Sequence, residues 1–367
     1  MKDHLVDYVM KQETPFMVVN LDTVISNYND LKTALPNVTP YYAIKAFPDP
    51  EVVKELHRHG CNFDVATNGE ITMLQEIGID AKRTIHTHPI KSDHSIKTAL
   101  DYGIDTFVVD NIHEIYKFEK YKDVAKLLIR VSFRGKTAIV DLSKKFGCNV
   151  RDVDGLIDQC KLLGIQVVGL SFHVGSQSKN SDDHVLAIKS CIPLLERHDL
   201  SVLDIGGGFP VTYIEQSANI FDFCKPISNA LKNVPSSVSI FCEPGRFMVG
   251  EACDCVASVV GMAERTDKIW YYLDDGVYGM FSGVIYDHVH YPLEVVTGED
   301  IHQYAKCVLA GPTCDSIDVI EDDIMLPILK IGDKIIGSTM GAYTFATAGT
   351  FNSLPIPKKI YYTKLSS

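Results

Sequence analysis

The chain has 367 residues, a formal net charge of −12, 46% hydrophobic residues and 22% charged residues, which is typical of a globular protein with two domains. The acidic balance disfavours nucleic-acid binding, because that affinity depends on clustered lysine and arginine. We expect no signal peptide and no membrane span, since the first residues lack an apolar segment and no apolar run reaches about 18 residues. Ten cysteines without a C-x-x-C framework predict reduced thiols, no metal site and a cytoplasmic location.

The first two thirds of the chain alternate between apolar strands and helical patterns. A short strand at Thr14–Val19 and a helix over Leu21–Leu35 come first. Eight strands are then expected at Tyr41–Lys45, Phe63–Ala66, Thr84–His86, Thr106–Asp110, Leu127–Val131, Val167–His173, Val202–Ile205 and Ile240–Glu243. Helical patterns separate them, such as Glu51–His59, Glu70–Ile77 and Val153–Leu163. Eight such units in one run favour a closed (β/α)8 TIM-like barrel.

From about Cys253 the pattern changes to short strands separated by turn residues. These strands are expected at Ile269–Leu273, Lys306–Leu309, Lys334–Gly337 and Lys359–Tyr362. Such a pattern predicts an all-β region. We therefore expect an α/β barrel over residues 36–250 and a C-terminal β-sandwich or barrel over 251–367. Residues 1–35 form an N-terminal segment that contributes to the β domain.

Polar residues and glycines follow three consecutive strands of the predicted barrel. Serine follows the first of these strands, a triple glycine the second, and a glycine with an arginine the third. The residues are Ser176, Gly206, Gly207, Gly208, Gly245 and Arg246. The carboxyl ends of barrel strands meet on one face, where backbone N–H groups can bind an anion. The pattern therefore predicts a phosphate site outside the barrel.

Lys45 ends the first predicted barrel strand, in the run Tyr41-Tyr42-Ala43-Ile44-Lys45. An amine buried at the barrel mouth would be nucleophilic, as a Schiff-base lysine requires. Considered alone, a lysine that extends to the rim is the simpler interpretation. Next to a phosphate site, however, the lysine favours pyridoxal phosphate (PLP), which carries both an aldehyde and a phosphate.

Four further residues near these strand ends each have two interpretations. Glu243 could bind the pyridine nitrogen of PLP or pair with Arg246, and His173 could stack on the cofactor ring or simply pack. Asp64 and Glu70 follow the second strand and could orient Lys45. The alternative for this segment is helix capping by Asp or Thr and first-turn dipole pairing by Glu.

The β region contains a second group of candidates. In Gly311-Pro312-Thr313-Cys314-Asp315 the thiol of Cys314 could donate a proton, although a single cysteine is more often a small buried hydrophobe. Tyr286 and Asp287 form a second acidic spot. Tyr343 offers a phenol that could reach the phosphate, and residues 340–348 otherwise read as an ordinary strand.

The ordered motifs resemble the fold-type III PLP-dependent decarboxylases, an alanine-racemase-like group that includes eukaryotic ornithine decarboxylase. These motifs are YAIK, FDVATNGE, SFHVGS, DIGGGFP, EPGR, DDGVYG, YDH, GPTCD and MGAYT, and the likeness runs from about Phe16 to Tyr362. One motif alone is weak, whereas the ordered set is highly specific. The resemblance implies the barrel and β-domain fold predicted above.

The resemblance also implies a role for each candidate residue. Lys45 would carry PLP, His173 would stack on its ring, and Glu243 would bind its nitrogen. The phosphate would be held by Ser176, Gly206, Gly207, Gly208, Arg246 and Tyr343. Cys314 would protonate the substrate carbon, and the distal ammonium of the substrate would bind Asp287 and Asp315, near Tyr286, Tyr278 and Phe351. Because Cys314 and Asp315 would reach the other subunit's barrel, the active form would be a homodimer with shared sites.

The expected activity is decarboxylation of a basic amino acid in polyamine biosynthesis, L-ornithine to putrescine first and L-lysine to cadaverine second. Asp141 stands where eukaryotic ornithine decarboxylases have arginine, which favours a bacterial-type lysine/ornithine enzyme. Diaminopimelate and arginine decarboxylase are alternatives of the same fold. A racemase would have a second base, typically tyrosine, in place of Cys314 and Asp315, and a non-catalytic regulatory homologue would have lost site residues.

Overall fold

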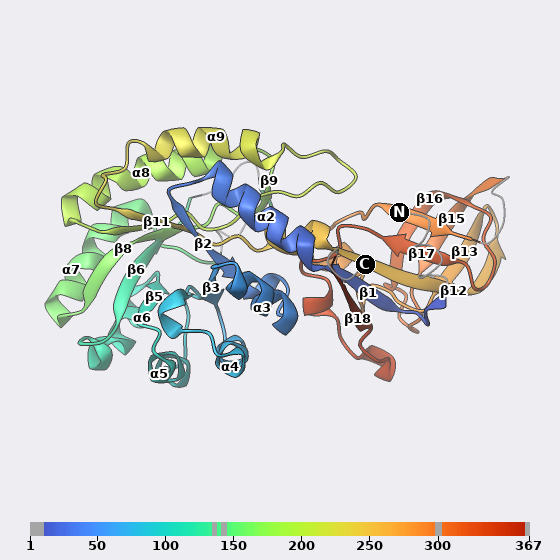
Figure 1. Ribbon diagram of the computed structural model, residues 1–367, viewed down its shortest axis with the longest axis horizontal. Coiled ribbons are helices and arrows are strands. Elements are labelled where there is room, and N and C mark those ends of the chain that lie inside the picture. Colours follow the sequence, from blue (N-terminus) through green and yellow to red (C-terminus); the bar gives the residue numbers. More distant parts are fainter. Residues whose placement is uncertain (1–10, 134–137, 141–144, 298–302, 364–367) are drawn as a thin grey trace. The chain divides into compact units, whose positions relative to one another are not determined.

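The computed structural model describes residues 11–133, 138–140, 145–297 and 303–363, and Figure 1 shows its ribbon. The chain divides into two compact units. Among the described residues, the barrel unit comprises those within 25–210 and 217–248, and the β unit comprises those within 11–24, 211–216 and 249–363. The boundary between the N-terminal part of the β unit and the barrel unit therefore lies inside helix α2 (Leu21–Ala34) rather than after residue 35. Residues 211–216 also belong to the β unit.

Eight parallel strands close the barrel in their order along the chain. They are β2 (Val38–Ala43), β3 (Asn62–Val65), β4 (Thr84–His86), β5 (Thr106–Val109), β6 (Lys126–Val131), β8 (Gln166–Phe172), β10 (Val202–Asp204) and β11 (Ser239–Cys242). The predicted α/β barrel is confirmed, and each strand overlaps its predicted range. Because all the strands are parallel, their carboxyl ends share one face, where the candidate residues of this unit lie.

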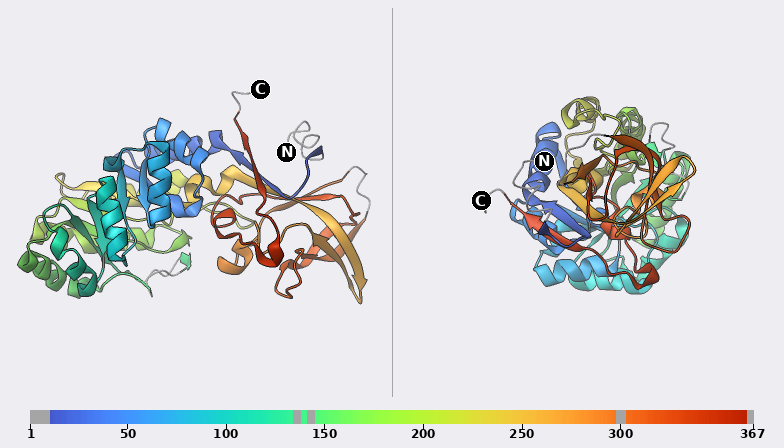
Figure 2. Two further views of the ribbon diagram at one scale, coloured as in Figure 1. Left: turned by 90° about the horizontal axis from the view of Figure 1, so that it is seen from below. Right: turned by 90° about the vertical axis from the view of Figure 1, so that its right-hand side faces the viewer.

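Helices lie on the outside of the barrel strands (Figures 1 and 2). After α2 they are α3 (Pro50–Arg58), α4 (Asn68–Ile77), α5 (Asp93–Tyr102), α6 (Ile112–Lys117), α7 (Val153–Leu163), α8 (Asp182–His198) and α9 (Ile220–Leu231), and the short helix α10 (Arg246–Val249) follows β11. Side-chain caps fix several starts: Asp49 caps α3, Ser92 caps α5 and Asn219 caps α9. None of the helices in the described part of the chain is long and apolar enough to cross a bilayer.

The β unit is a mixed sheet built around the long strand β12 (Cys253–Arg265). The sheet order is β14 (Leu293–Val296), β17 (Lys334–Gly337), β12, β13 (Lys268–Leu273), β15 (Tyr304–Ala310) and β16 (Val319–Pro327). The first strand of the chain, β1 (Phe16–Asn20), pairs antiparallel with β12 and parallel with β18 (Lys358–Tyr362). Buried side chains of Phe16, Val256, Val296 and Ile336 form an apolar core that ties this N-terminal strand into the sheet.

Two local features differ from the predictions. Residues 341–344 form a turn followed by the short helix η6 (Phe345–Thr347), not a strand. Gly341 makes this turn possible, because a Cβ atom there would lie 1.8 Å from the carbonyl oxygen of Val249. The second feature is a ribbon of β7 (Ala138–Val140) and β9 (Ser176–Ser178), which was not predicted and which places Ser176 in a strand.

Candidate functional site

An ion pair stands at the end of the first two barrel strands. Lys45 lies in a single 3-10 turn, η1 (Ile44–Ala46), directly after β2, and its Nζ atom is 2.7 Å from Oδ2 of Asp64 in β3. The Asp64 side chain is fully buried, whereas 39% of the Lys45 side chain is exposed. Lys45 therefore lies just after the strand rather than ending it, and its side chain is half-buried rather than fully buried at the barrel mouth. A buried carboxylate fixes an amine that an incoming aldehyde can still reach.

A second carboxylate is connected to the first through Thr87, which directly follows β4. The Thr87 Oγ1 atom lies 2.5 Å from Oδ1 of Asp64 and 3.4 Å from Oε2 of Glu243. Glu243 also contacts Asp204, and burial, then the charge of Asp204, raises the pKa of Glu243 well above its usual value. Burial raises the pKa of Asp204 too. A hydrogen bond between two carboxyl groups needs one proton, so this buried pair holds one.

Glu70 stabilises the start of α4. Its carboxylate accepts hydrogen bonds from the backbone N–H groups of Ala66 at 2.5 Å and Thr67 at 3.2 Å, while the Thr67 hydroxyl accepts one from the N–H group of Glu70 at 3.4 Å. This reciprocal arrangement is a capping box, and it agrees with the helix-capping alternative for this segment. Of the two acids expected near Lys45, Asp64 makes the direct ion pair.

His173 follows β8 and carries a neutral ring. Its Nδ1 atom accepts a hydrogen bond from the N–H group of Gly175 at 3.0 Å, which assigns the ring proton to Nε2. Burial, and then the charges of Arg130 and Lys45, lower the pKa of His173 well below 6.5. A neutral imidazole with a fixed orientation is suited to packing against an aromatic ring.

The three glycines after β10 form a cradle of bare backbone. Gly206 and Gly208 have φ angles of +66° and +97°, in the left-handed region that favours glycine. A Cβ atom on Gly206 would lie 2.3 Å from the carbonyl oxygen of Phe172, and one on Gly207 would lie 2.7 Å from that of Glu243. Side chains are therefore excluded, and the backbone can approach an anion closely.

Arg246 and Ser176 supply side-chain donors beside this cradle. Arg246, which starts α10, directs Nε and Nη2 to Oγ of Ser176 at 3.3 Å each, and the Arg246 residue is only 6% exposed. The β9 strand that begins at Ser176 is bonded to the cradle, since the Ser178 N–H group donates to the Gly208 carbonyl at 3.1 Å. A guanidinium, a hydroxyl and a glycine turn together are a typical phosphate-binding set.

His184 of α8 supports the cradle from within the barrel unit. Its Nε2 atom lies 2.9 Å from the carbonyl oxygen of Gly207, and its ring stacks on Phe209 with centroids 5.7 Å apart. Burial lowers the pKa of His184 to about 4, so the ring is neutral at pH 7. A neutral ring that donates from Nε2 to this carbonyl fixes the turn at Gly207.

A separate group of candidates lies in the β unit around Tyr278. The Tyr278 hydroxyl donates to Oδ2 of Asp315 at 2.6 Å, and its ring stacks on Phe351 with centroids 4.4 Å apart. This hydrogen bond lowers the pKa of Asp315 and raises that of Tyr278 to about 12. Asp315 is therefore a carboxylate at neutral pH, which is the form that attracts an ammonium group.

The loop that carries Cys314 is fixed by the buried Asp318. Asp318 is 2% exposed and accepts hydrogen bonds from the N–H groups of Val277 at 2.9 Å and Thr313 at 3.0 Å. The N–H group of Cys314 donates to Oδ1 of Asn352 at 3.1 Å, and Cys314 itself is exposed. The interpretation of Cys314 as a buried hydrophobe is therefore wrong, because a firmly held loop presents the thiol to solvent.

The other predicted residues of the β unit lie on turns. Tyr286 is 63% exposed at the end of α11 (Gly283–Tyr286), and the half-buried Asp287 follows it. Tyr343 lies in the turn after Gly341 with a φ angle of +55°. Asp141 lies outside the described residues.

Four residues of these clusters were not singled out from the sequence: Thr87, His184, Asp204 and Asp318. Asp204 stands in the DIGGG motif, next to the glycines, and could have been found there. A lone threonine after a strand and an aspartate beyond GPTCD carry no such signal. Their importance comes from the burial and hydrogen bonds that the fold gives them.

Residues 21–250 match the family model described as "Pyridoxal-dependent decarboxylase, pyridoxal binding domain". Among curated proteins, the chain is 37% identical to a lysine/ornithine decarboxylase of Selenomonas ruminantium, over 95% of this chain and 90% of that protein. The family model covers the barrel part of the chain, and the curated relative covers nearly its whole length.

Solved structures of high similarity agree with this. Two structures of a Vibrio vulnificus lysine/ornithine decarboxylase, one complexed with putrescine and one with cadaverine, are 46% identical, with TM-scores of 0.92 and 0.93. They cover 98% of this chain, which covers 97% and 98% of theirs. An arginine decarboxylase of Paramecium bursaria Chlorella virus, bound to agmatine, is 31% identical, with a TM-score of 0.93 over 98% of this chain and 100% of that one.

Proposed function

Because the chain belongs to the pyridoxal-dependent decarboxylase family, we propose that it decarboxylates a basic amino acid, converting L-ornithine to putrescine and L-lysine to cadaverine. The observation that carries this proposal is the Lys45–Asp64 ion pair on the same barrel face as the bare glycine cradle and Arg246. An amine for an aldehyde and a cradle for a phosphate are the two ends of a PLP site.

The residues of the barrel unit fit PLP in their chemistry as well as in their placement. The Gly206–Gly208 cradle, Ser176 and Arg246 would hold the phosphate, with Gly245 keeping the turn before Arg246 free of a side chain. Lys45 would hold the aldehyde carbon. When bound, PLP supplies an electron sink for the pair of electrons left by the departing α-carboxylate.

The charged and aromatic neighbours would then orient the ring. Burial raises the pKa of the Glu243 carboxyl group. A protonated ring nitrogen beside it would lower that pKa again and favour the carboxylate form. The neutral His173 would pack on the ring face. Asp64 fixes the Lys45 amine, and Glu70 fixes the helix that follows β3. We further propose that Tyr343 of the β unit contributes its phenol to the phosphate.

The β-unit cluster would bind the substrate end that distinguishes one amino acid from another. Asp315 is a carboxylate held by Tyr278, and Phe351 stacks on the same tyrosine. With Asp287 and Tyr286, it would attract the distal ammonium of ornithine or lysine. The exposed Cys314 thiol would carry the proton that replaces the carboxylate on the α-carbon. One methylene is worth about 1–3 kcal/mol of discrimination, so activity on both substrates is expected.

We propose that the active form is a cytoplasmic homodimer in which Cys314 and Asp315 complete the barrel site of the other subunit. The exposure of Cys314 supports an acceptor surface outside its own loop, and ten free cysteines support a reducing compartment. Mixed inactive Lys45→Ala and Cys314→Ala subunits should recover activity, because one hybrid site keeps both residues. No recovery on mixing would count against shared sites.

Two other substrates and a non-catalytic role are the alternatives. Diaminopimelate ends in a carboxylate and would need a cation, but no arginine follows Arg265, and Asp287 and Asp315 are acidic. Arginine is favoured only by the 31% identical viral relative. A non-catalytic homologue would be expected to lack Lys45 or Cys314, and both are present.

The function is tested by measuring carbon dioxide release from ornithine, lysine, arginine and diaminopimelate side by side. We expect release from ornithine and lysine, little from arginine, and none from any substrate with the Lys45→Ala variant. Lys54→Ala is a matched control, because Lys54 pairs with Glu51 on the exposed side of α3. Diaminopimelate as the best substrate, or no release from any of the four, would overturn the proposal.

A further inference from the structure

Thr87 contacts both carboxyl groups that the proposed function assigns to opposite ends of the cofactor. Its Oγ1 atom is 2.5 Å from the Asp64 carboxylate, which pairs with Lys45, and 3.4 Å from the Glu243 carboxyl group. We propose that Thr87 is a positioning residue that connects the carboxylate partner of Lys45 to the buried Glu243–Asp204 pair. The inference rests on the proposed function, because both ends matter only when PLP lies between them.

One hydroxyl proton cannot serve two carboxylates, which fixes the direction of each bond. Because the 2.5 Å contact with Asp64 is much shorter than the 3.4 Å contact with Glu243, the Thr87 hydroxyl donates its proton to Asp64. The 3.4 Å contact to Oε2 of Glu243 is then only a close approach, because the one proton of the Glu243–Asp204 pair lies between those two carboxyl groups. The Thr87 hydroxyl therefore hydrogen-bonds to the carboxylate that pairs with Lys45 and lies directly beside the Glu243 carboxyl group.

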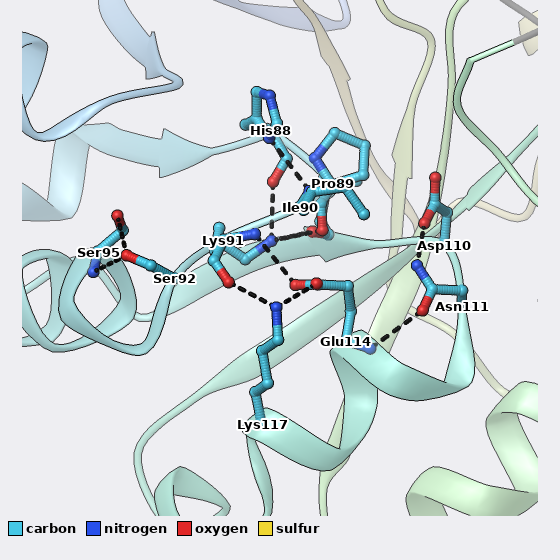
Figure 3. Close-up of polar contacts among 11 residues, drawn as sticks. His88, Pro89, Ile90, Lys91, Ser92, Ser95, Asp110, Asn111, Glu114 and Lys117 are labelled. Atoms are coloured by element: carbon cyan, nitrogen blue, oxygen red, sulfur yellow. Dashed lines mark hydrogen bonds and ion pairs between the residues drawn. The ribbon is translucent and has the colours of Figure 1, made fainter.

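The backbone holds Thr87 firmly in this place. Thr87 is 5% exposed, and its N–H group donates to the carbonyl oxygen of Val65 in β3 at 3.2 Å. The segment that follows is fixed by Lys91, as Figure 3 shows. The Lys91 ammonium donates to the carbonyl oxygens of His88 at 2.7 Å, Pro89 at 3.1 Å and Val108 at 2.6 Å.

Helix α6 holds the Lys91 backbone from the other side. The N–H group of Lys91 donates to Oε2 of Glu114 at 3.1 Å, and the Lys117 ammonium donates to the Lys91 carbonyl at 2.7 Å and also pairs with Glu114 (Figure 3). Lys91 is 3% exposed, so these bonds are sheltered from water. The hydroxyl of Thr87 therefore meets Asp64 in a preorganised arrangement.

The hydrogen bond from Thr87 to Asp64 lowers the proton affinity of the nitrogen on Lys45. A donor on Oδ1 of Asp64 withdraws negative charge from the carboxylate, so the carboxylate attracts a proton on that nitrogen less strongly. Without the hydroxyl, the protonated nitrogen should persist to higher pH. The other charged or titratable groups whose electrostatic effects reach this site are Glu70, His86, His88, Arg130, His173, Asp204 and Glu243.

The test is a spectroscopic pH titration of bound PLP in the holoenzyme, together with the dissociation constant of PLP and the separate kcat and KM values. Thr87→Val removes the hydroxyl while keeping the shape, and Thr87→Ser restores it. Thr84→Val is the matched control, because Thr84 is a buried residue of β4 whose hydroxyl has no hydrogen-bond partner within the described residues.

We expect Thr87→Val to move the absorbance midpoint upward by about one pH unit, a tenfold change in the protonation equilibrium, and to lower kcat more than it changes KM. Thr87→Ser and Thr84→Val should titrate like the wild type. If Thr87→Val fails to bind PLP, Thr87→Ala replaces it in the same comparison. Equal midpoints in the wild type and the hydroxyl-free variant, or a shift that Thr87→Ser shares, would overturn the inference.

Failure of the inference and failure of the proposed function give different results. A wild-type protein that forms no borohydride-reducible adduct with PLP contradicts the proposed function itself. A wild type that forms the adduct and titrates identically to Thr87→Val contradicts only the role of Thr87.

Discussion

Asp64, Asp204 and Glu243 are buried in the barrel unit, whereas in the β unit Cys314 is exposed and Asp315 is half-buried. The buried set is held by hydrogen bonds within its own unit, and burial raises the pKa values of Asp204 and Glu243. The β-unit set has a firm backbone but presents its reactive side chains outward. The first arrangement suits a tightly bound cofactor, and the second suits groups that meet a substrate which comes and goes.

The largest effect is expected at the centre of the barrel cluster. Lys45→Ala should abolish turnover with ornithine and lysine, because no other described group is paired in this way with Asp64. The Lys54→Ala variant, which removes an exposed lysine of the same unit, should keep wild-type rates. Carbon dioxide release measures the turnover of both variants. Near-normal turnover in Lys45→Ala would contradict the role of Lys45 as the PLP-binding lysine.

The next effect is expected in the β unit and should leave PLP in place. Cys314→Ala should lower kcat about 10²–10⁴-fold, the usual contribution of general acid catalysis, with an unchanged dissociation constant for PLP. Cys148→Ala, at a partly buried cysteine of the barrel unit, is the control. A variant that loses PLP but keeps its rate at saturating cofactor would show that Cys314 is structural.

Asp315→Asn tests whether the β-unit cluster binds the substrate, because the variant should change KM and not PLP binding. Asparagine can still accept the hydrogen bond of Tyr278, but the negative charge is lost, so KM for ornithine and lysine should rise about tenfold. PLP binding should not change. Asp323→Asn, at an exposed aspartate of the same unit that pairs with Lys268, is the matched control. Unchanged KM values for both substrates would disprove the ammonium site.

The smallest effect concerns the stability of the barrel unit and its dependence on pH. The pKa of His184 is about 4 in the folded protein, below the unfolded value of about 6.5. The unfolded chain therefore binds more protons in between, so the free energy of unfolding falls as pH falls from 6.5 towards 4, by about 2 kcal/mol at pH 5.

This component should be absent from His184→Phe, so unfolding by denaturant at pH 8 and pH 5 should show a smaller difference in this variant than in the wild type. His86 is also buried and contributes in the same direction, but equally to both proteins. His94→Phe, at an exposed histidine on α5, controls for the substitution. An identical pH dependence in all three proteins would contradict the burial argument.

The sequence predicts most of the fold because its barrel strands are short apolar runs and its helices carry capping residues. These patterns predict the eight barrel strands and a helix capped by Asp or Thr near Glu70, whereas the reciprocal capping box of Thr67 and Glu70 is seen only in the structure. The long strand β12 was missed, because its outer half is exposed and has little apolar signal. Lys45 was expected to be buried, since a strand pattern cannot show that the chain turns at Ala43.

The residues of the candidate site that stand in sequence motifs could be predicted, whereas those defined by tertiary contacts could not. The triple glycine and Arg246 predict a phosphate site from their residue types and their positions after strands. The link from Asp64 through Thr87 to Glu243 joins three different strand ends, so it exists only after the barrel has closed. Likewise, the role of Asp318 depends on backbone N–H groups from two separate loops.

The most direct measurement is to locate the PLP adduct after borohydride reduction of the holoenzyme. The reduced cofactor should be found by mass spectrometry on the peptide that contains Lys45, beside the buried carboxylate of Asp64. Lys91 is the informative comparison, because it is another lysine of the barrel unit but is buried and bonded to three carbonyl oxygens. An adduct on Lys45 alone agrees with the account, and an adduct on Lys91, on another lysine or on none contradicts it.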